Sequence, residues 1–166
     1  GIGHRRLSII DLSESGNQPM LSANGRYILT FNGEIYNYLD IRKKLERRGI
    51  RFFSKTDSEV VLNALAQWGT DYLKEFNGMF ALALFDRKEN KLLLARDRYG
   101  IKPLYYSKQA KSFAFASEQK AIITLPGFTR VLNKGALYEY FTFQNIFTNQ
   151  TLLNDIFILK PGHFGE

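Results

Sequence analysis

In the stretch "MFALALFD" at residues 79–86, apolar residues occupy both of the alternating faces that a strand would have. Successive side chains of a strand point to opposite faces, so a strand with one wet face alternates apolar and polar residues. The absence of alternation predicts a strand that is covered on both sides. "RKEN" at 87–90 is then a turn, and "KLLLARD" at 91–97 is the return strand.

Helical and strand patterns flank this pair. "KTDSEVVLNALAQWG" has an apolar face at helical spacing, with Thr56 or Asp57 as its N-cap and Gly69 as its stop. A second helix begins near Asn37, which together with Asp40 resembles a capping box, and it stops at Gly49. Further strands are expected at 4–10, 51–54, 103–108 and 112–118, and further helices at about 118–124 and 134–142. This mixture predicts an α+β domain with stacked sheets under helices.

The sequence contains two Asn-Gly pairs in similar surroundings. Asn24-Gly25 lies between two strand-like runs, which predicts a two-residue hairpin. Asn32-Gly33 is followed almost at once by a helical pattern, and too few residues remain for a return strand. We therefore expect the second pair at the end of a strand, on the turn toward the helix.

Composition narrows the class of protein. A chain of 166 residues with 45% hydrophobic content suits one domain over residues 1–166. The net charge is +7, but its densest cluster, "RKKLERR" at 42–48, lies in a helical pattern, so a solvated helix face is favoured over a nucleic-acid patch. The chain has no cysteine and two separated histidines, which argues against disulfides and a zinc site. Without a transmembrane stretch or signal peptide, we expect a cytoplasmic protein with no membrane or nucleic-acid partner.

Five polar or glycine residues at the ends of predicted elements are candidates for a site. Each has a plain alternative: Arg6 as a surface cation, Asn32-Gly33 as a turn, Glu34 as a solvated acid and Asp57 as an N-cap. Together they would suit a free amino acid. A guanidinium binds a carboxylate, two carboxylates bind an ammonium, and an amide side chain with a glycine N–H stabilises an oxyanion.

A family resemblance joins these observations. In chain order, "GHRRLSIIDLS", "QPM", "NGEIYNY", "DSEVVL", "FNGMFALALFD", "ARDRYGIKPLYY" and "FASEQKAI" resemble the glutaminase domain of class II glutamine amidotransferases, and more narrowly its asparagine-synthetase branch. The resemblance covers residues 1–166, and "QTLLNDIFILKPGH" is similar to the segment that leads to an ATP-dependent synthetase domain. It implies the N-terminal-nucleophile hydrolase fold, an αββα sandwich of two stacked antiparallel sheets flanked by helices. We expect the first strand and helix of that fold to be missing here.

The resemblance also implies roles for six residues. It assigns Asn32 and Gly33 to the oxyanion hole, Glu34 and Asp57 to the α-ammonium of glutamine, Arg6 to its α-carboxylate, and Ile9 to the pocket wall through its backbone. The family's nucleophile is an N-terminal cysteine, which we expect some four or five dozen residues upstream of Gly1. The sequence contains no cysteine, so this polypeptide alone is predicted not to hydrolyse glutamine.

The full protein is expected to release glutamate and ammonia and to amidate a carboxylate, with aspartate as the default acceptor. ATP and magnesium would belong to the synthetase domain, and no cofactor is expected in residues 1–166. L-glutamine, the synthetase domain and a second copy of the chain are the expected partners. The alternatives are the glutaminase half of the phosphoribosylamine-forming or glucosamine-phosphate-forming branch, and a non-catalytic interaction module. Arg96 and Asp97 are interpreted as an ion pair that fixes a turn, outside the site.

Overall fold

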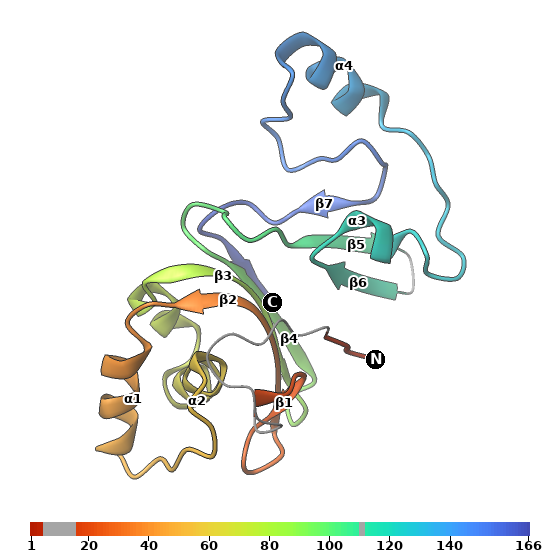
Figure 1. The fold of residues 1–166 in the computed structure, drawn as a ribbon. Helices are drawn as coiled ribbons and strands as arrows, with labels where there is room; N and C mark the ends of the chain where they lie inside the picture. The colour runs from red at the N-terminus through yellow and green to blue at the C-terminus, as the bar shows by residue number, and fades with distance from the viewer. Residues whose placement is uncertain (5–15, 110–111) are drawn as a thin grey trace.

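The computed structural model describes residues 1–4, 16–109 and 112–166, which Figure 1 shows as a ribbon. The strands are β1 (Met20–Leu21), β2 (Tyr27–Ile35), β3 (Gly78–Asp86), β4 (Lys91–Arg96), β5 (Tyr105–Gln109), β6 (Ser112–Ala116), β7 (Phe157–Ile158) and β8 (Phe164–Gly165). The helices are α1 (Tyr38–Glu46), α2 (Asp57–Trp68), α3 (Gln119–Ile122), α4 (Lys134–Phe143) and the 3₁₀ helix η2 (Thr70–Glu75).

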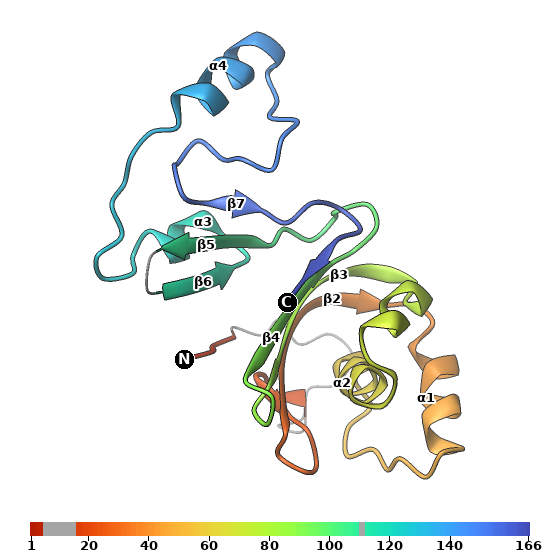
Figure 2. The ribbon, with the colours of Figure 1, turned by 180° about the vertical axis from the view of Figure 1, so that it is seen from behind.

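The strands form two antiparallel sheets. The larger has the order β1-β2-β3-β4-β8, and the smaller has the order β6-β5-β7. Helices α1 and α2 lie against one side of the larger sheet, and the smaller sheet lies on its other side (Figures 1 and 2). The predicted α+β class with two antiparallel sheets is confirmed.

Strand β3 is buried on both faces, as its sequence predicts. Phe80 and Leu82 belong to the core that packs under α1 and α2. Ala81 and Ala83 belong to a second, smaller core, where they pack with Leu104 next to the smaller sheet. The two faces of one strand therefore join both layers of the domain, and this explains why the sequence shows no polar positions between residues 80 and 84.

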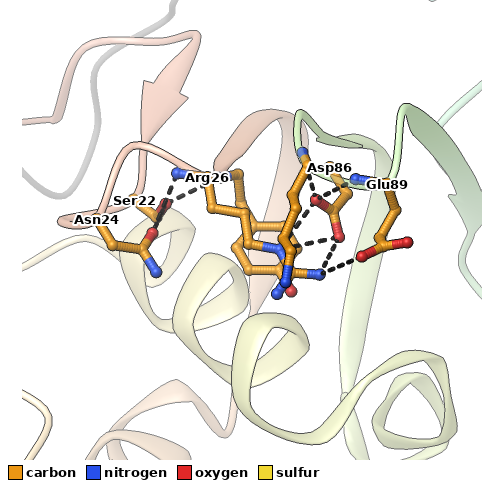
Figure 3. Close-up of polar contacts among 7 residues, drawn as sticks. Ser22, Asn24, Arg26, Asp86 and Glu89 are labelled. Carbon is orange, nitrogen blue, oxygen red and sulfur yellow. Dashed lines mark hydrogen bonds and ion pairs between the residues drawn. The ribbon is translucent and has the colours of Figure 1, made fainter.

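The first Asn-Gly pair does form a hairpin between β1 and β2, but its loop is longer than predicted. Ser22 N donates to Tyr27 O at 2.9 Å, and Gly25, at φ 70°, donates to Ser22 O at 2.8 Å. Asn24 Oδ1 accepts the N–H of Arg26 at 3.1 Å and the hydroxyl of Ser22 at 2.8 Å (Figure 3). These local bonds spread the turn over four residues, because the Asn24 side chain takes the place of a shorter backbone turn.

An ion pair between Arg26 and Asp86 joins this loop to β3. Arg26 donates to both oxygens of Asp86, with Nε–Oδ1 at 2.9 Å and Nη2–Oδ2 at 2.7 Å (Figure 3). Its Nη2 also lies 3.8 Å from Glu89 Oε1. The hairpin therefore closes on a bidentate ion pair at the far end of the β2–β3 ladder.

Two expectations about local structure are wrong. Asn37 does not cap α1; its side chain instead donates to Glu75 O and accepts from Asn77 N, which joins the start of the helix to the segment before β3. Residues 51–54 are not a strand. The N–H groups of Phe53 and Ser54 donate to the Glu59 carboxylate of α2, so a helix side chain replaces the neighbouring strand that a sheet would need.

The remaining expectations for the helices hold. Thr56 caps α2 by accepting from Glu59 N, and Gly69 ends the helix at φ 70°. Helix α3 lies within its predicted range, and α4 ends one residue beyond the predicted 134–142. The strand expected at 4–10 falls largely outside the described residues. None of the helices in the described part of the chain has the length and apolarity that a membrane span requires.

Candidate functional site

Asn32, Gly33 and Glu34 lie inside β2 rather than on a turn, which corrects the expectation from the sequence. The ladder with β3 continues past them to the pair Ile35–Gly78. The chain turns toward α1 only afterwards, where Tyr36 N donates to Asn77 O at 2.7 Å. The partner strand is β3, some fifty residues later in the chain, so no local return strand is needed.

The alternation of β2 sorts its side chains between two faces. Phe31 and Ile35 are buried in the core under the helices. Asn32 and Glu34, one residue out of phase, therefore project from the opposite face of the sheet. Both side chains line the same cavity there.

Gly33 is required by the close approach of β2 and β3. Its φ is 154°, and a Cβ at this position would lie 2.1 Å from Met79 O and 2.7 Å from the Cα of Phe80. Gly78 makes the reciprocal contact, because its Cβ would lie 2.1 Å from Glu34 O. Any side chain at either glycine would collide with main chain that cannot move aside without breaking the ladder.

The outer edge of β2 places the main-chain donors near this cavity. Phe31 N donates to Gln18 Oε1 at 2.6 Å, and Ile35 N donates to Asp57 Oδ2 at 3.0 Å. Both N–H groups therefore point away from β3. Because N–H directions alternate along a strand, Gly33, which lies between Phe31 and Ile35, directs its N–H to the same edge. A main-chain donor thus faces the side on which Gly33 lines the cavity.

The cavity has a volume of about 610 Å³, which is within the usual range for small-molecule sites. Four predicted site residues line it: Asn32, Gly33, Glu34 and Asp57. The other lining residues are Gly3, His4, Gln18, Phe31, Thr56, Ser58, Met79, Lys102, Ala116, Ser117, Glu118, Lys120 and Ala121. The structure therefore brings residues from β2, α2, the β4–β5 loop and the β6–α3 junction to one place.

Asp57 and Glu34 form an acidic pair in the wall of the cavity. Asp57 is the first residue of α2 and is 5% exposed. Burial raises the pKa of its carboxyl group, the backbone N–H groups of Ile35 and Ser58 lower it, and the charge of Glu34 raises it further. The charge of Glu34 disfavours ionisation of Asp57, and an ammonium between the two carboxylates would relieve this repulsion, so the pair favours a cationic ligand.

Arg6 and Ile9 lie outside the described residues, so the structure does not place them. Among the lining residues, the sequence interpretation missed Gln18 and Lys102. Gln18 binds both main-chain groups of Phe31, because its Oε1 accepts from Phe31 N and its Nε2 donates to Phe31 O at 2.9 Å. The only sequence signal for either residue is that they lie in "QPM" and "GIKP", within stretches that carry the family resemblance.

The described residues include no group of acidic or histidine side chains arranged to hold a metal ion. The polar lining offers carboxylates, amides, main-chain N–H groups and the ammonium of Lys102. Such a set can bind a zwitterion by its charged groups and can stabilise a developing oxyanion.

The chain belongs to the glutamine amidotransferase domain family, which matches it over residues 1–166. Within class II of these domains, the chain is related to the glutamine-hydrolysing asparagine synthetases. It is 39% identical over 164 residues to asparagine synthetase 3 of Bacillus subtilis, covering 97% of this chain and 26% of that protein. The resemblance seen in the sequence is confirmed.

Two further comparisons agree. Asparagine synthetase 1 of Bacillus subtilis is 38% identical over 162 residues, covering 98% of this chain and 25% of that protein. The chain thus spans about a quarter of the length of the curated relatives it matches. In fold it is similar to glutamine phosphoribosylpyrophosphate amidotransferase from Bacillus subtilis, with a TM-score of 0.63 and 24% identity, covering 78% of this chain and 30% of that one.

Proposed function

We propose that this chain is the glutamine-hydrolysing domain of an asparagine synthetase-like enzyme, and that the cavity beside β2 binds L-glutamine. The observation that carries the proposal is that Glu34 and Asp57 lie together in one cavity with Asn32 and Gly33. The two carboxylates would hold the α-ammonium. The Asn32 amide and the Gly33 N–H would receive the oxyanion that forms at the side-chain carbonyl. Arg6 would bind the α-carboxylate and Ile9 would line the pocket, as the family resemblance implies.

The reaction needs a nucleophile that this sequence does not contain, because it has no cysteine. In the longer protein, an N-terminal cysteine thiolate would attack the side-chain amide carbon of glutamine. A carbon–sulfur bond forms, the carbon–nitrogen bond breaks, and ammonia leaves with a proton relayed by the cysteine's own α-amine. Water then hydrolyses the thioester to glutamate. This chain alone should bind glutamine without turning it over.

The ammonia would serve an ATP-dependent synthetase domain of the same protein, with aspartate as the default acceptor and with ATP and magnesium held by that domain. The names of the relatives and the quarter of their length that the chain spans support this assignment. We propose accordingly that residues 1–166 are a partial domain, which an upstream strand and helix complete as an αββα sandwich in the cytoplasm.

An aromatic surface on α4 and on the segment that follows it, up to Phe147, supports a contact with that second domain. Tyr138, Phe141 and Phe147 are 72%, 74% and 70% exposed. Residues 134–147 carry only two charged side chains, Lys134 and Glu139. The central area that becomes buried when two proteins bind is typically rich in aromatic residues and poor in charged ones. Because most of the relatives' length lies beyond this chain, we propose that the synthetase domain covers this surface.

Replacing Phe141 with serine tests this contact. In the longer protein, the variant should lower glutamine-dependent asparagine formation while glutamine hydrolysis continues. If the isolated chain instead forms dimers in the analytical ultracentrifuge, and Phe141→Ser returns it to monomers, the surface belongs to a homodimer.

Titration calorimetry of this chain with L-glutamine tests the site itself. Binding should be saturable with L-glutamine and absent with D-glutamine, and Glu34→Gln should weaken it. Glu89→Gln is the matched control, because Glu89 is an exposed acid at the remote end of the β3–β4 turn. Unchanged affinity in Glu34→Gln contradicts the assignment, and glutamine turnover by this chain above a buffer blank contradicts the need for a cysteine.

The alternatives make different predictions. A domain of the phosphoribosylamine-forming or glucosamine-phosphate-forming branch would bind glutamine equally well, but the longer protein would deliver ammonia to a sugar phosphate rather than to aspartate. A non-catalytic module would show no glutamine binding even in the longer protein. The asparagine branch is favoured because the curated relatives with 38–39% identity over nearly the whole chain are asparagine synthetases.

A further inference from the structure

Asp97 is a fully buried carboxylate that the proposed chemistry does not use. It follows β4 directly and has 0% exposure. The sequence suggested an ion pair between Asp97 and Arg96, but each side chain binds main-chain groups instead. Arg96 donates to the carbonyls of Gly100, Lys102 and Leu159 at 2.6–2.7 Å.

The Asp97 carboxylate accepts four backbone N–H groups. Oδ1 accepts from Tyr99 and Ile101, both at 3.0 Å. Oδ2 accepts from Lys102 at 3.1 Å and from Phe80 at 3.2 Å. Burial raises the pKa of Asp97, but these four donors outweigh it and leave the pKa below the ordinary value. The group is therefore a charged anchor for the main chain.

One of these four donors belongs to β3, directly opposite the proposed oxyanion donor. Phe80 is the ladder partner of Gly33. Phe80 also accepts from Asp97 N at 2.8 Å, so both main-chain groups of Phe80 are bound to Asp97. Because β2 packs against Phe80 without room for a Cβ at Gly33, any movement of Phe80 must move Gly33 as well.

A second donor belongs to the opposite wall of the cavity. Lys102 lines the cavity, and its main chain is held on both sides, with its N–H on Asp97 Oδ2 and its carbonyl on Arg96 Nε at 2.7 Å. Asp97 Oδ2 thus accepts both from β3, the strand paired with Gly33, and from the loop that carries Lys102.

We propose that Asp97 is a positioning residue for the glutamine site, which sets the direction of the Gly33 N–H through Phe80 and the opposite wall of the cavity through Lys102. Asp97 acts through these main-chain groups and contacts no substrate. The inference rests on the proposed function in that it takes the Gly33 N–H as the oxyanion donor. The link from Asp97 to Gly33 can nevertheless be tested without glutamine.

The first test compares ¹H–¹⁵N spectra of Asp97→Asn and the unmodified chain. Asparagine keeps the size of the side chain but turns an NH₂ toward two of the four donors. The amide resonances of Phe80 and Gly33 should therefore shift along with those of Tyr99 and Ile101. Asp86→Asn, at the other end of β3, is the matched control and should leave Gly33 unchanged. Shifts in Asp97→Asn that are confined to residues 97–102 would overturn the inference, because they describe an anchor of the loop alone.

A measurement on the unmodified chain covers the case in which Asp97→Asn does not fold. Scalar couplings across hydrogen bonds should connect the Phe80 and Lys102 amides to the side-chain carboxyl carbon of Asp97. No coupling from Phe80, with a coupling from Ile101 present in the same spectrum, would overturn the proposal.

The kinetic test uses the longer protein with its cysteine. Asp97→Asn should lower kcat for glutamine hydrolysis about 10-fold or more, because a misdirected donor fails in the transition state. KM should change less than about 2-fold, since Glu34 and Asp57 still bind the substrate. Equal losses in kcat and in the folded fraction would overturn the positioning role. An unmodified longer protein without glutaminase activity would overturn the proposed function, while the amide spectra still decide the inference about Asp97.

Discussion

Asn24-Gly25 and Asn32-Gly33 are the same dipeptide, a few residues apart, in two different structural roles. The first lies on a loop, and the nearest atom to a Cβ at Gly25 would be an arginine nitrogen 4.0 Å away. The second lies within a strand, where main chain of β3 would be 2.1 Å from a Cβ at Gly33. Gly25 is needed for its own φ of 70°, whereas Gly33 is needed because another strand lies against it. The comparison shows that a glycine after an asparagine can be needed either for a local turn or for a close tertiary contact.

The acids near the two pairs differ in the same way. Asp86, near the first pair, is neutralised by Arg26, whose hydrogen bond lowers the pKa of Asp86 to about 2 (Figure 3). Asp57, near the second pair, is buried and close to Glu34, and its pKa is raised. The hairpin region therefore satisfies its charges internally. The cavity region carries an unfavourable arrangement that a ligand can relieve, as expected for a binding site.

The largest difference between the pairs should come from adding one methyl group to each glycine. Gly33→Ala should cost about 4 kcal/mol or more of unfolding free energy, because the clash is with main chain. Gly25→Ala should cost about 1–2 kcal/mol, the strain of a left-handed residue with open space around it. Urea unfolding followed by circular dichroism measures both. Equal losses would show that the two strands separate at Gly33 without cost.

Truncating the two asparagines should separate catalysis from stability. In the proposed longer protein with an N-terminal cysteine, Asn32→Ala should lower kcat about 100-fold or more, corresponding to about 3 kcal/mol, as for loss of an oxyanion donor. Asn24→Ala is the matched control; it loses two loop hydrogen bonds, should cost about 1 kcal/mol of stability, and should leave kcat unchanged. Similar kcat values for the two variants would remove Asn32 from the site.

The two aspartates should show opposite effects on binding and stability. Asp57→Asn should weaken glutamine binding about 10-fold, or about 1.4 kcal/mol, while stability changes little, because asparagine still accepts from Ile35 N. Asp86→Asn should lower stability by breaking the bond with Arg26 and should leave glutamine affinity unchanged. Calorimetry and urea unfolding of the same samples test both halves. Unchanged affinity in Asp57→Asn would contradict the acidic pair.

The smallest expected effect is in the pH dependence of stability. The folded pKa of Asp86 is about 2 against an ordinary value of 3.8, so its stabilising contribution is complete above pH 3.8 and is lost as the pH falls toward 2. The pKa of Asp57 is raised above 3.8, so the folded state holds the extra proton and this group's contribution declines as the pH rises above 3.8.

Urea unfolding from pH 2 to pH 7 should therefore give a flatter acid limb for Asp86→Asn. Asp57→Asn should flatten the pH dependence of the unfolding free energy above pH 3.8, toward neutral pH. A profile of Asp57→Asn that matches the unmodified chain at every pH would show that this carboxyl titrates normally.

Elements with local signals can be predicted from the sequence. Burial of β3 on both faces follows from its uninterrupted apolar run, and α2 with its Thr56 cap and Gly69 stop follows from helical spacing. The hairpin at Asn24-Gly25 follows from turn chemistry. The family motifs also identified four residues that the structure places in one cavity. In each case the residues that interact lie near one another in the chain or belong to one recognisable pattern.

The positions at which distant segments meet become visible only in the folded chain. The local pattern predicts a turn at Asn32-Gly33 because its partner strand, β3, lies some fifty residues away and leaves no signal near the pair. The missing strand at 51–54 has the same cause, since Glu59 supplies its hydrogen bonds from a helix. The surroundings of Asp97 also depend on the fold, because four N–H groups from two segments meet at its carboxylate only in the folded chain. Local propensity is carried by neighbours in sequence, whereas hydrogen-bond partners and cavity walls depend on which strands pack together.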